Sequence, residues 1–159
     1  MLCPGFIDMH AHSALESFRD PRLIPKPGPQ EWTWSTMAEY LDALAGTRPA
    51  TTLVPSVGHN AVRDYVIGGA SRRPTAEEVR AMQRESRLGC EAGARTLSFG
   101  LIYLPGTFAE TDELVALARE AARAGVPLMP HVRNEADGVL EAVGEIYAAM
   151  ARRLIEGEM

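Results

Sequence analysis

Residues 5–13, GFIDMHAHS, decide the fold class of this 159-residue chain. Small and apolar residues lead into an acid and two histidines, His10 and His12. In an extended strand alternate side chains share one face, so Asp8, His10 and His12 are expected on the same side. At about 3.3 Å per residue, these two histidines lie about 6.6 Å apart along the strand, close enough for their imidazoles to lean onto one metal ion. Two inert, hydrogen-bonded histidines are the alternative, but histidine is the commonest metal ligand and the pair favours a metal site.

Size and composition place the chain among single-domain globular proteins. Of its residues, 46% are hydrophobic and 23% charged, and the net charge of -5 gives no electrostatic footprint for nucleic acid. Two cysteines, Cys3 and Cys90, form no CxxC motif, so a reducing compartment is expected and Cys90 is interpreted as a packing residue. Without a signal-like or membrane-spanning apolar run, we expect a cytoplasmic location and no membrane partner.

The rest of the chain alternates between strand and helix signals, separated early on by a proline-rich loop at 18–30. Further strands are expected at 51–57, 95–102 and 126–132, and helices at 32–45, 61–67, 75–92, 112–124 and 137–155. The helix at 75–92 has the clearest start, because Thr75 and Glu78 form a Thr-x-x-Glu capping box. The arginines and glutamates along it predict a solvated face with ion pairs. Strands alternating with helices predict an α/β fold with a parallel sheet.

Polar residues gather where these strands end, which is where parallel α/β folds carry their functional groups. His131 ends the fourth strand and is followed by Arg133, Asn134 and Glu135. Tyr103 follows the third strand. Together with His10 and His12, they form the candidate site.

Each of these residues also has a structural interpretation. His131 alone could be a satisfied core histidine, although its combination with the opening HxH pair favours metal binding. Tyr103 could pack beneath Pro105. Arg133 could form a structural ion pair with Glu135 or Glu141, and a substrate role is an equal alternative. His59, between Gly58 and Asn60, is expected in a surface loop.

Several separate motifs resemble those of one known family. They are PGFIDMHAHS at 4–13, WTWSTMAEYLDAL at 32–44, LVPSVGHN at 53–60, RRPTAEEVRAM at 72–82, LSFGLIYLPGTFAETDELVALAREAARAG at 97–125 and HVRNEADGVLEAV at 131–143. The chain resembles the amidohydrolase superfamily, and within it the N-acyl-D-amino-acid deacylase (D-aminoacylase) branch. The resemblance implies that residues 1–159 form a single domain, a partial (β/α)8 TIM barrel of about four strands.

The resemblance also implies a chemistry. His10, His12 and His131 would bind zinc, and Tyr103, Arg133, Asn134 and Glu135 would line the site of a small N-acyl amino acid. The implied reaction is hydrolysis of the acyl amide bond, with the metal polarising the carbonyl and activating water. The family's cysteine ligand is expected to be deleted between residues 22 and 31. Its general-base aspartate is expected to lie beyond Met159, so no catalytic acid or base is assigned.

Two other functions remain open from the sequence. The chain could be a non-catalytic half-barrel that forms homo-oligomers and so covers its open face. It could also be a phosphoesterase of the polymerase-and-histidinol-phosphatase type, since those chains open with an HxH strand as well. The deacylase-like segments between residues 97 and 143 disfavour this last alternative.

Overall fold

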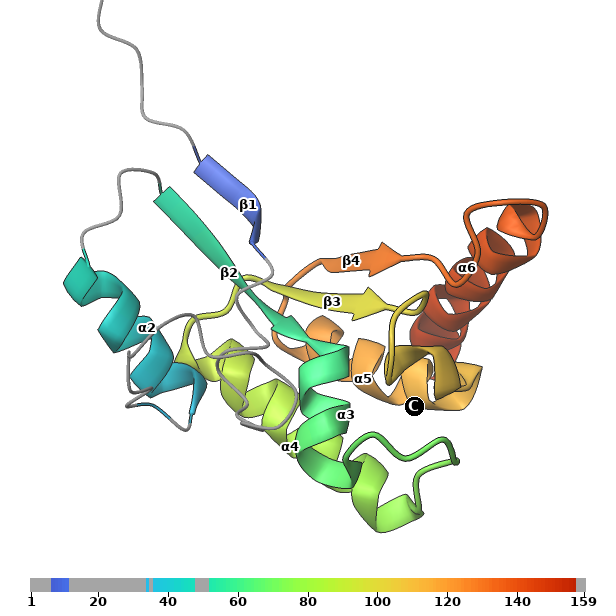
Figure 1. Cartoon of the computed structure of the whole chain (residues 1–159), viewed down its shortest axis with the longest axis horizontal. Helices are drawn as coiled ribbons and strands as arrows, with labels where there is room; N and C mark the ends of the chain where they lie inside the picture. Colours follow the sequence, from blue (N-terminus) through green and yellow to red (C-terminus); the bar gives the residue numbers. More distant parts are fainter. Residues whose placement is uncertain (1–6, 12–33, 35, 48–51, 157–159) are drawn as a thin grey trace, which may run out of the picture.

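The computed structural model describes residues 7–11, 34, 36–47 and 52–156, so the proline-rich stretch at 18–30 lies outside the described residues (Figure 1). Four strands form one sheet: β1 (Ile7–Ala11), β2 (Thr52–Gly58), β3 (Thr96–Gly100) and β4 (Leu128–His131). Their order in space is the order in sequence, and every neighbouring pair is parallel. The predicted parallel α/β fold is therefore confirmed.

The helices connect the strands on one side of the sheet. They are α2 (Met37–Thr47), α3 (His59–Ile67), α4 (Ala76–Ala92), α5 (Thr111–Arg123) and α6 (Val139–Glu156), with a short 3₁₀ turn, η1, at Gly106–Phe108. Helices α3, α4 and α5 lie along one face of the sheet, and α6 packs against α5 (Figure 1). No helix in the described part of the chain has both the length and the apolar character needed to cross a bilayer.

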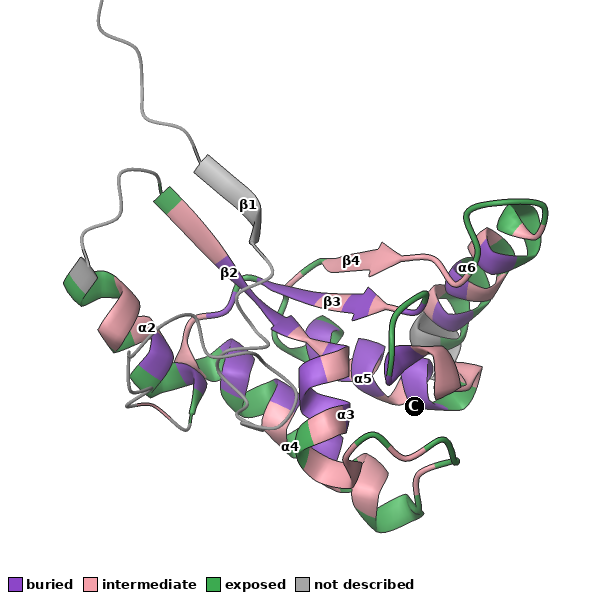
Figure 2. Ribbon diagram, viewed as in Figure 1, coloured by how far each residue is buried: buried purple, intermediate pink, exposed green. Residues whose placement is uncertain are grey.

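The core lies between the sheet and these helices, where the purple segments of Figure 2 meet. Val57, Leu97 and Phe99 from the strands pack in one cluster with Leu114 and Leu117 of α5, all at most 3% exposed. Burying one such side chain contributes about 1.5–3 kcal/mol. Since side chains alternate along a strand, Ser98 and Gly100 face the opposite side of the sheet.

Helix α4 begins as its sequence predicts. Thr75 accepts a hydrogen bond from the Glu78 amide, and the Glu78 carboxylate accepts one from the Thr75 amide at 2.7 Å. Glu78 also forms an ion pair with Arg72, and its hydrogen bond lowers the pKa of the Glu78 carboxyl to about 2. Further ion pairs along α4 confirm the predicted charged face. The helix ends at Ala92 and is followed by Gly93, whose φ of 124° favours glycine.

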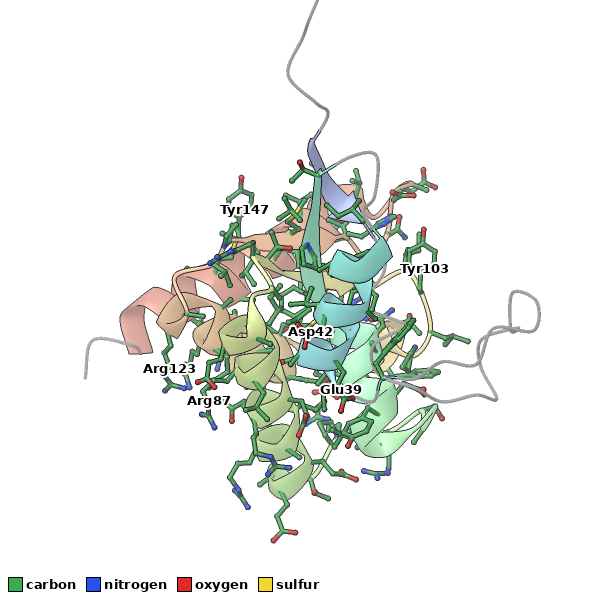
Figure 3. The ribbon with its side chains drawn as sticks, turned by 90° about the vertical axis from the view of Figure 1, so that its left-hand side faces the viewer. Glu39, Asp42, Arg87, Tyr103, Arg123 and Tyr147 are labelled. Atoms are coloured by element: carbon green, nitrogen blue, oxygen red, sulfur yellow. The ribbon has the colours of Figure 1, made fainter. Side chains whose placement is uncertain are left out.

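A buried carboxylate joins α4 to α5. Glu120 is 2% exposed and accepts a hydrogen bond from Gln83 of α4 at 3.2 Å. Arg123 pairs with the same carboxylate, and Arg87 lies 3.8 Å from it. Figure 3 shows Arg87 of α4 and Arg123 of α5 beside one another. The charged groups therefore fix the packing of the helix pair that supports β3.

Several elements begin at other residues than the sequence analysis predicts, among them α3 at His59 rather than residue 61 and α6 at Val139 rather than residue 137. Helix α2 starts at Met37 rather than at residue 32, because Thr36 and Glu39 form a second reciprocal pair of backbone hydrogen bonds at its start. Trp34 lies before the helix, and its ring packs against that of Tyr40 with the two centroids 5.7 Å apart. Strand β4 starts at Leu128 rather than at residue 126.

Candidate functional site at the carboxyl end of the sheet

His131 is the last residue of β4 and pairs in register with Gly100 of β3. Leu97 and Phe99 of β3 face the helices, so Gly100 and His131 belong to the opposite face, which α3, α4 and α5 leave open. The imidazole is 27% exposed, and its Nε2 donates to Oε1 of Glu135 at 2.7 Å. His131 is therefore held by a carboxylate rather than enclosed in the core.

Tyr103 stands next to His131. The two rings meet edge to face, with centroids 5.2 Å apart and planes at 87°. Tyr103 is 55% exposed and projects from the molecule (Figure 3). The structure thus brings together three predicted site residues, Tyr103, His131 and Glu135, from the ends of two neighbouring strands.

Arg133 forms an ion pair, but not with the partners that the sequence analysis names. Its Nε and Nη2 donate to the two carboxylate oxygens of Glu145 on α6, at 3.0 and 2.9 Å. The same guanidinium donates to the backbone oxygens of Thr107 and Ala109, at 2.6 and 2.7 Å. Glu135 and Glu141 are therefore wrong as partners: Glu135 bonds to His131, and Glu145 occupies the helix position that faces Arg133.

Asn134 shapes the loop after β4. Its Oδ1 accepts a hydrogen bond from the Ala136 amide at 2.7 Å, which is the pattern of an Asx turn. A Cβ at Gly138 would lie 3.1 Å from the Asn134 amide nitrogen, so the loop closes tightly over this side chain. The amide group of Asn134 thus has a local structural role at the edge of the site.

The predicted histidine pair lies at the limit of what the structure describes. His10 belongs to β1, in the stretch between Asp8 and Ala11 where the pairing with β2 is irregular, and such irregularities are common beside active sites. His12 lies outside the described residues. Within the described ranges, no group of three metal-binding side chains comes together.

The surroundings of His131 fit those of a metal ligand. Metal-binding histidines usually donate their second ring nitrogen to a carboxylate, which fixes the tautomer and the ring orientation. Glu135 accepts from Nε2, so Nδ1 carries the lone pair of the neutral ring. The donor chemistry of His131 therefore suits zinc, which binds neutral imidazole nitrogen.

His59 is not in a surface loop, which corrects the sequence interpretation. It is the first residue of α3, has no exposed surface, and lies edge to face with Phe99 at 5.4 Å. Its Nε2 lies 2.7 Å from Glu113 Oε1, and its Nδ1 lies 3.2 Å from Asn60 Oδ1. Both ring nitrogens of His59 therefore face oxygen atoms of neighbouring side chains.

Glu113 is the centre of this buried cluster, because Arg63 of α3 also pairs with its carboxylate. Burial raises the pKa of the Glu113 carboxyl, but the hydrogen bonds and charges of His59 and Arg63 outweigh burial and lower it overall. No local sequence signal could have identified the cluster, since His59 and Glu113 are 54 positions apart. The cluster lies on the helix side of the sheet and supports the site from beneath.

Two further features lie away from Tyr103, His131 and Glu135. Cys90 packs in the core, as expected, and burial followed by the charges of Glu120 and Glu91 raises the pKa of its thiol. A cavity of about 360 Å³ opens at the start of α5, and none of Tyr103, His131 and Glu135 lines it; its lining residues are Ala109, Glu110, Thr111, Asp112, Arg133 and Glu145.

Comparisons with known proteins identify relatives along almost the whole chain, although no family profile matches it. The chain is 34% identical to the N-acyl-D-glutamate deacylase of Alcaligenes xylosoxydans xylosoxydans, over 96% of this chain and 38% of that protein. It is 30% identical to the N-acyl-D-aspartate deacylase of the same organism, over 91% of this chain and 36% of that protein. The first alignment extends over 183 positions, more than the chain contains, so that relative has residues that this chain lacks.

Solved structures agree with the sequence relatives. The N-acyl-D-glutamate deacylase from Bordetella bronchiseptica, complexed with zinc and a phosphonate mimic of the tetrahedral intermediate, has a TM-score of 0.74 and 33% identity, over 92% of this chain and 37% of that one. A D-aminoacylase structure that defines a novel subset of amidohydrolases has a TM-score of 0.77 and 25% identity, over 92% of this chain and 38% of that one. The described sheet and helices are thus part of a TIM barrel. The chain is a homologue of the N-acyl-D-amino-acid deacylase (D-aminoacylase) branch of the amidohydrolases, and it spans less than half the length of the relatives that it matches.

Proposed function

We propose that this chain forms part of a metal-dependent hydrolase that cleaves the amide bond of N-acyl-D-amino acids. The observation that carries the proposal is the cluster of His131, Glu135 and Tyr103 on the open face of the sheet, at the carboxyl end of β4. The sequence similarity to the N-acyl-D-glutamate and N-acyl-D-aspartate deacylases supports this reaction class.

In this proposal His10, His12 and His131 bind zinc. Alternation along a strand supports the shared face of the first two, and the carboxylate on Nε2 supports His131 as the third. β1 and β4 are separated by two strands, so their backbones lie roughly 14 Å apart across the sheet at about 4.8 Å per strand. The curvature of a barrel brings side chains from both strands toward one centre. When bound, the ion supplies Lewis-acid activation of the amide carbonyl and of water.

The other site residues have different roles. Tyr103 lines the substrate space, because its ring is exposed and stands against His131. Glu135 orients the His131 ring through its hydrogen bond. Asn134 and Arg133 maintain the loops around the site, because their polar groups already bond to protein atoms. The substrate is a small N-acyl amino acid.

The experiment measures zinc and turnover on the same purified chain. We expect one zinc per chain by elemental analysis, and release of the free amino acid from N-acetyl-D-glutamate or N-acetyl-D-aspartate but not from their L isomers. Exchange of His131 for glutamine removes the zinc, whereas Glu110→Gln, a matched change of an exposed carboxylate away from the site, retains it. Metal-free protein without turnover would overturn the proposal, as would phosphatase activity without amide hydrolysis.

A self-associating, non-catalytic half-barrel is a second candidate, favoured by the exposed apolar surface of α6. Leu140 is 81% exposed and Tyr147 is 69% exposed, and they lie seven residues apart on one side of the helix. Light scattering tests this candidate directly. A concentration-dependent oligomer that binds no zinc supports it, and a monomer at all concentrations contradicts it.

A further inference from the structure

We propose that Arg133 is a positioning residue, which holds Tyr103 against His131 and does not itself contact the substrate. The importance of the two rings for catalysis rests on the function proposed above. The clamp that Arg133 forms does not depend on that function.

The guanidinium of Arg133 has almost no donor left for a ligand. Of the five N–H groups of an arginine side chain, four are directed at Glu145, Thr107 and Ala109, at distances between 2.6 and 3.0 Å. The pairing with Glu145 is bidentate, and both side chains are largely buried, at 28% and 18% exposure. A substrate carboxylate would have to displace bonds that the protein already makes.

These bonds hold the segment that carries Tyr103. Thr107 and Ala109 lie in and just after η1, in the connection between β3 and α5. Thr107 accepts from Arg133 with its carbonyl, and its amide donates to the carbonyl of Tyr103 at 2.9 Å. Through its backbone carbonyl and amide, Thr107 therefore links the Arg133 guanidinium to the backbone of Tyr103.

The same segment is held at its other end. Nδ2 of Asn60 donates to the carbonyl of Gly100 at 3.0 Å, and the amide of Leu101 donates to the carbonyl of His131 at 3.1 Å. Arg133 supplies the corresponding bonds beyond Tyr103. The tyrosine thus stands on a loop that is tied to α3 and β4 on one side and to α6, through Glu145, on the other.

Tyr103 needs such support because burial does not hold its ring. More than half of its surface is exposed, and its edge-to-face contact with His131 is worth only about 0.5–1.5 kcal/mol. The position of the ring therefore depends on its backbone. Lysine cannot replace arginine in this clamp, since a single ammonium group cannot pair with a carboxylate in two places and reach two carbonyls at once.

The test is an NMR experiment on the whole 159-residue chain, without metal or substrate. In the unchanged protein, a cross-relaxation signal joins the ring protons of Tyr103 and His131. Arg133→Lys removes this signal, and Glu145→Gln, which keeps one acceptor but not the charge, weakens it. The matched control is Arg152→Lys, in an exposed ion pair with Asp112 at 2.7 Å, which leaves the signal unchanged.

Kinetics separate the clamp from a substrate contact. If the chain hydrolyses N-acyl-D-amino acids, Arg133→Lys lowers kcat/KM on the order of tenfold to a hundredfold, the cost of misplacing a group near the chemistry. Lower kcat/KM with the ring signal intact would show that Arg133 contacts the substrate, and would overturn the proposal. An intact signal in both Arg133→Lys and Glu145→Gln would overturn it too, as would a loss of the signal in Arg152→Lys. Absence of zinc and turnover would overturn the proposed function alone, since the ring signal needs neither.

Discussion

His59 donates from Nε2 to Oε1 of Glu113 across 2.7 Å, and neither side chain has more than 2% of its surface exposed. The bond joins the first turn of α3 to the first turn of α5, directly behind the end of β3. Arg63 contributes a guanidinium cation to the same carboxylate. One carboxylate therefore joins a buried arginine and a buried histidine, which makes Glu113 the residue on which this part of the core depends.

Replacement of Glu113 by glutamine should destabilise the protein by about 3 kcal/mol, because it leaves the Arg63 guanidinium buried without a counter-charge. The free energy of unfolding, from urea titrations followed by circular dichroism, measures the loss. Glu110→Gln is the control, since the pair of Glu110 with Arg73 is exposed and should cost less than about 1 kcal/mol. Equal losses for the two variants would contradict the central role of Glu113.

The lowered pKa of Glu113 also predicts how stability depends on pH. Folding favours the ionised carboxyl, so its contribution is complete above the ordinary pKa of about 4.3 and is lost as the pH falls through the lower pKa of the folded state. The difference in unfolding free energy between the unchanged protein and Glu113→Gln should shrink as the pH falls through the lowered pKa of the Glu113 carboxyl. Urea titrations at several pH values measure it. A difference that grows toward low pH would contradict the assignment.

Gly106 should not tolerate a side chain. A Cβ at this position would lie 2.6 Å from the carbonyl oxygen of Gly100 and would also clash with the side-chain amide of Asn60. Gly106→Ala should therefore cost about 1–3 kcal/mol, the usual range for overpacking. Gly46→Ala is the matched control, because nothing lies within 4 Å of its Cβ and alanine favours a helix. Thermal unfolding compares the two, and equal melting temperatures would contradict the close approach.

The capping box at the start of α4 should contribute measurably to stability. Thr75→Ala removes the acceptor for the Glu78 amide and should cost about 1 kcal/mol. Ser71→Ala, an exposed substitution four residues earlier, should change the unfolding free energy by less than about 0.5 kcal/mol. Urea titration of both variants shows whether the loss of stability comes from the missing cap or from the loss of any hydroxyl group in this segment.

Removal of the carboxylate beside His131 should weaken zinc binding if the proposed metal site is correct. Glu135→Gln should lower the zinc affinity by about tenfold to a hundredfold, the usual effect of losing a carboxylate that orients a metal-binding histidine. Isothermal titration with zinc alone measures the affinity. An unchanged zinc affinity would show that Glu135 does not contribute to the metal site, although zinc could still bind there.

Most of the fold could be predicted because its signals are local. Short apolar and β-branched runs predict the strands, and the Thr75–Glu78 capping box marks the start of α4 within one residue. The start of α2 was misplaced because Trp34 fits the helical period, although Thr36 and Glu39 repeat the same capping pattern four residues later than the predicted start. In both helices the cap, rather than the apolar period, marks the first residue.

The candidate site was only partly predictable. Strand ends identify where Tyr103, His131 and Glu135 gather, since that placement follows from the parallel sheet alone. The partner of Arg133 could not be read from the sequence, because it depends on which turn of α6 faces β4, and this turn carries Glu145. The burial of His59 was missed for a similar reason: its partner Glu113 comes from a helix that begins more than fifty residues later.

Pro130 has a consequence for how the sheet can grow. Within the described residues β4 pairs only with β3, and Leu97 and Leu101 donate to the carbonyls of Pro127 and His131. The N–H and C=O groups of the odd-numbered residues of β4 therefore point toward β3. The backbone nitrogen and carbonyl of residue 130 point away from β3, toward the free edge. Proline has no amide hydrogen, so the outer rim of β4 lacks a donor at its middle. Another strand can pair with this edge only in a register that needs no hydrogen bond from residue 130. This restriction disfavours non-specific edge-to-edge pairing between copies of the chain.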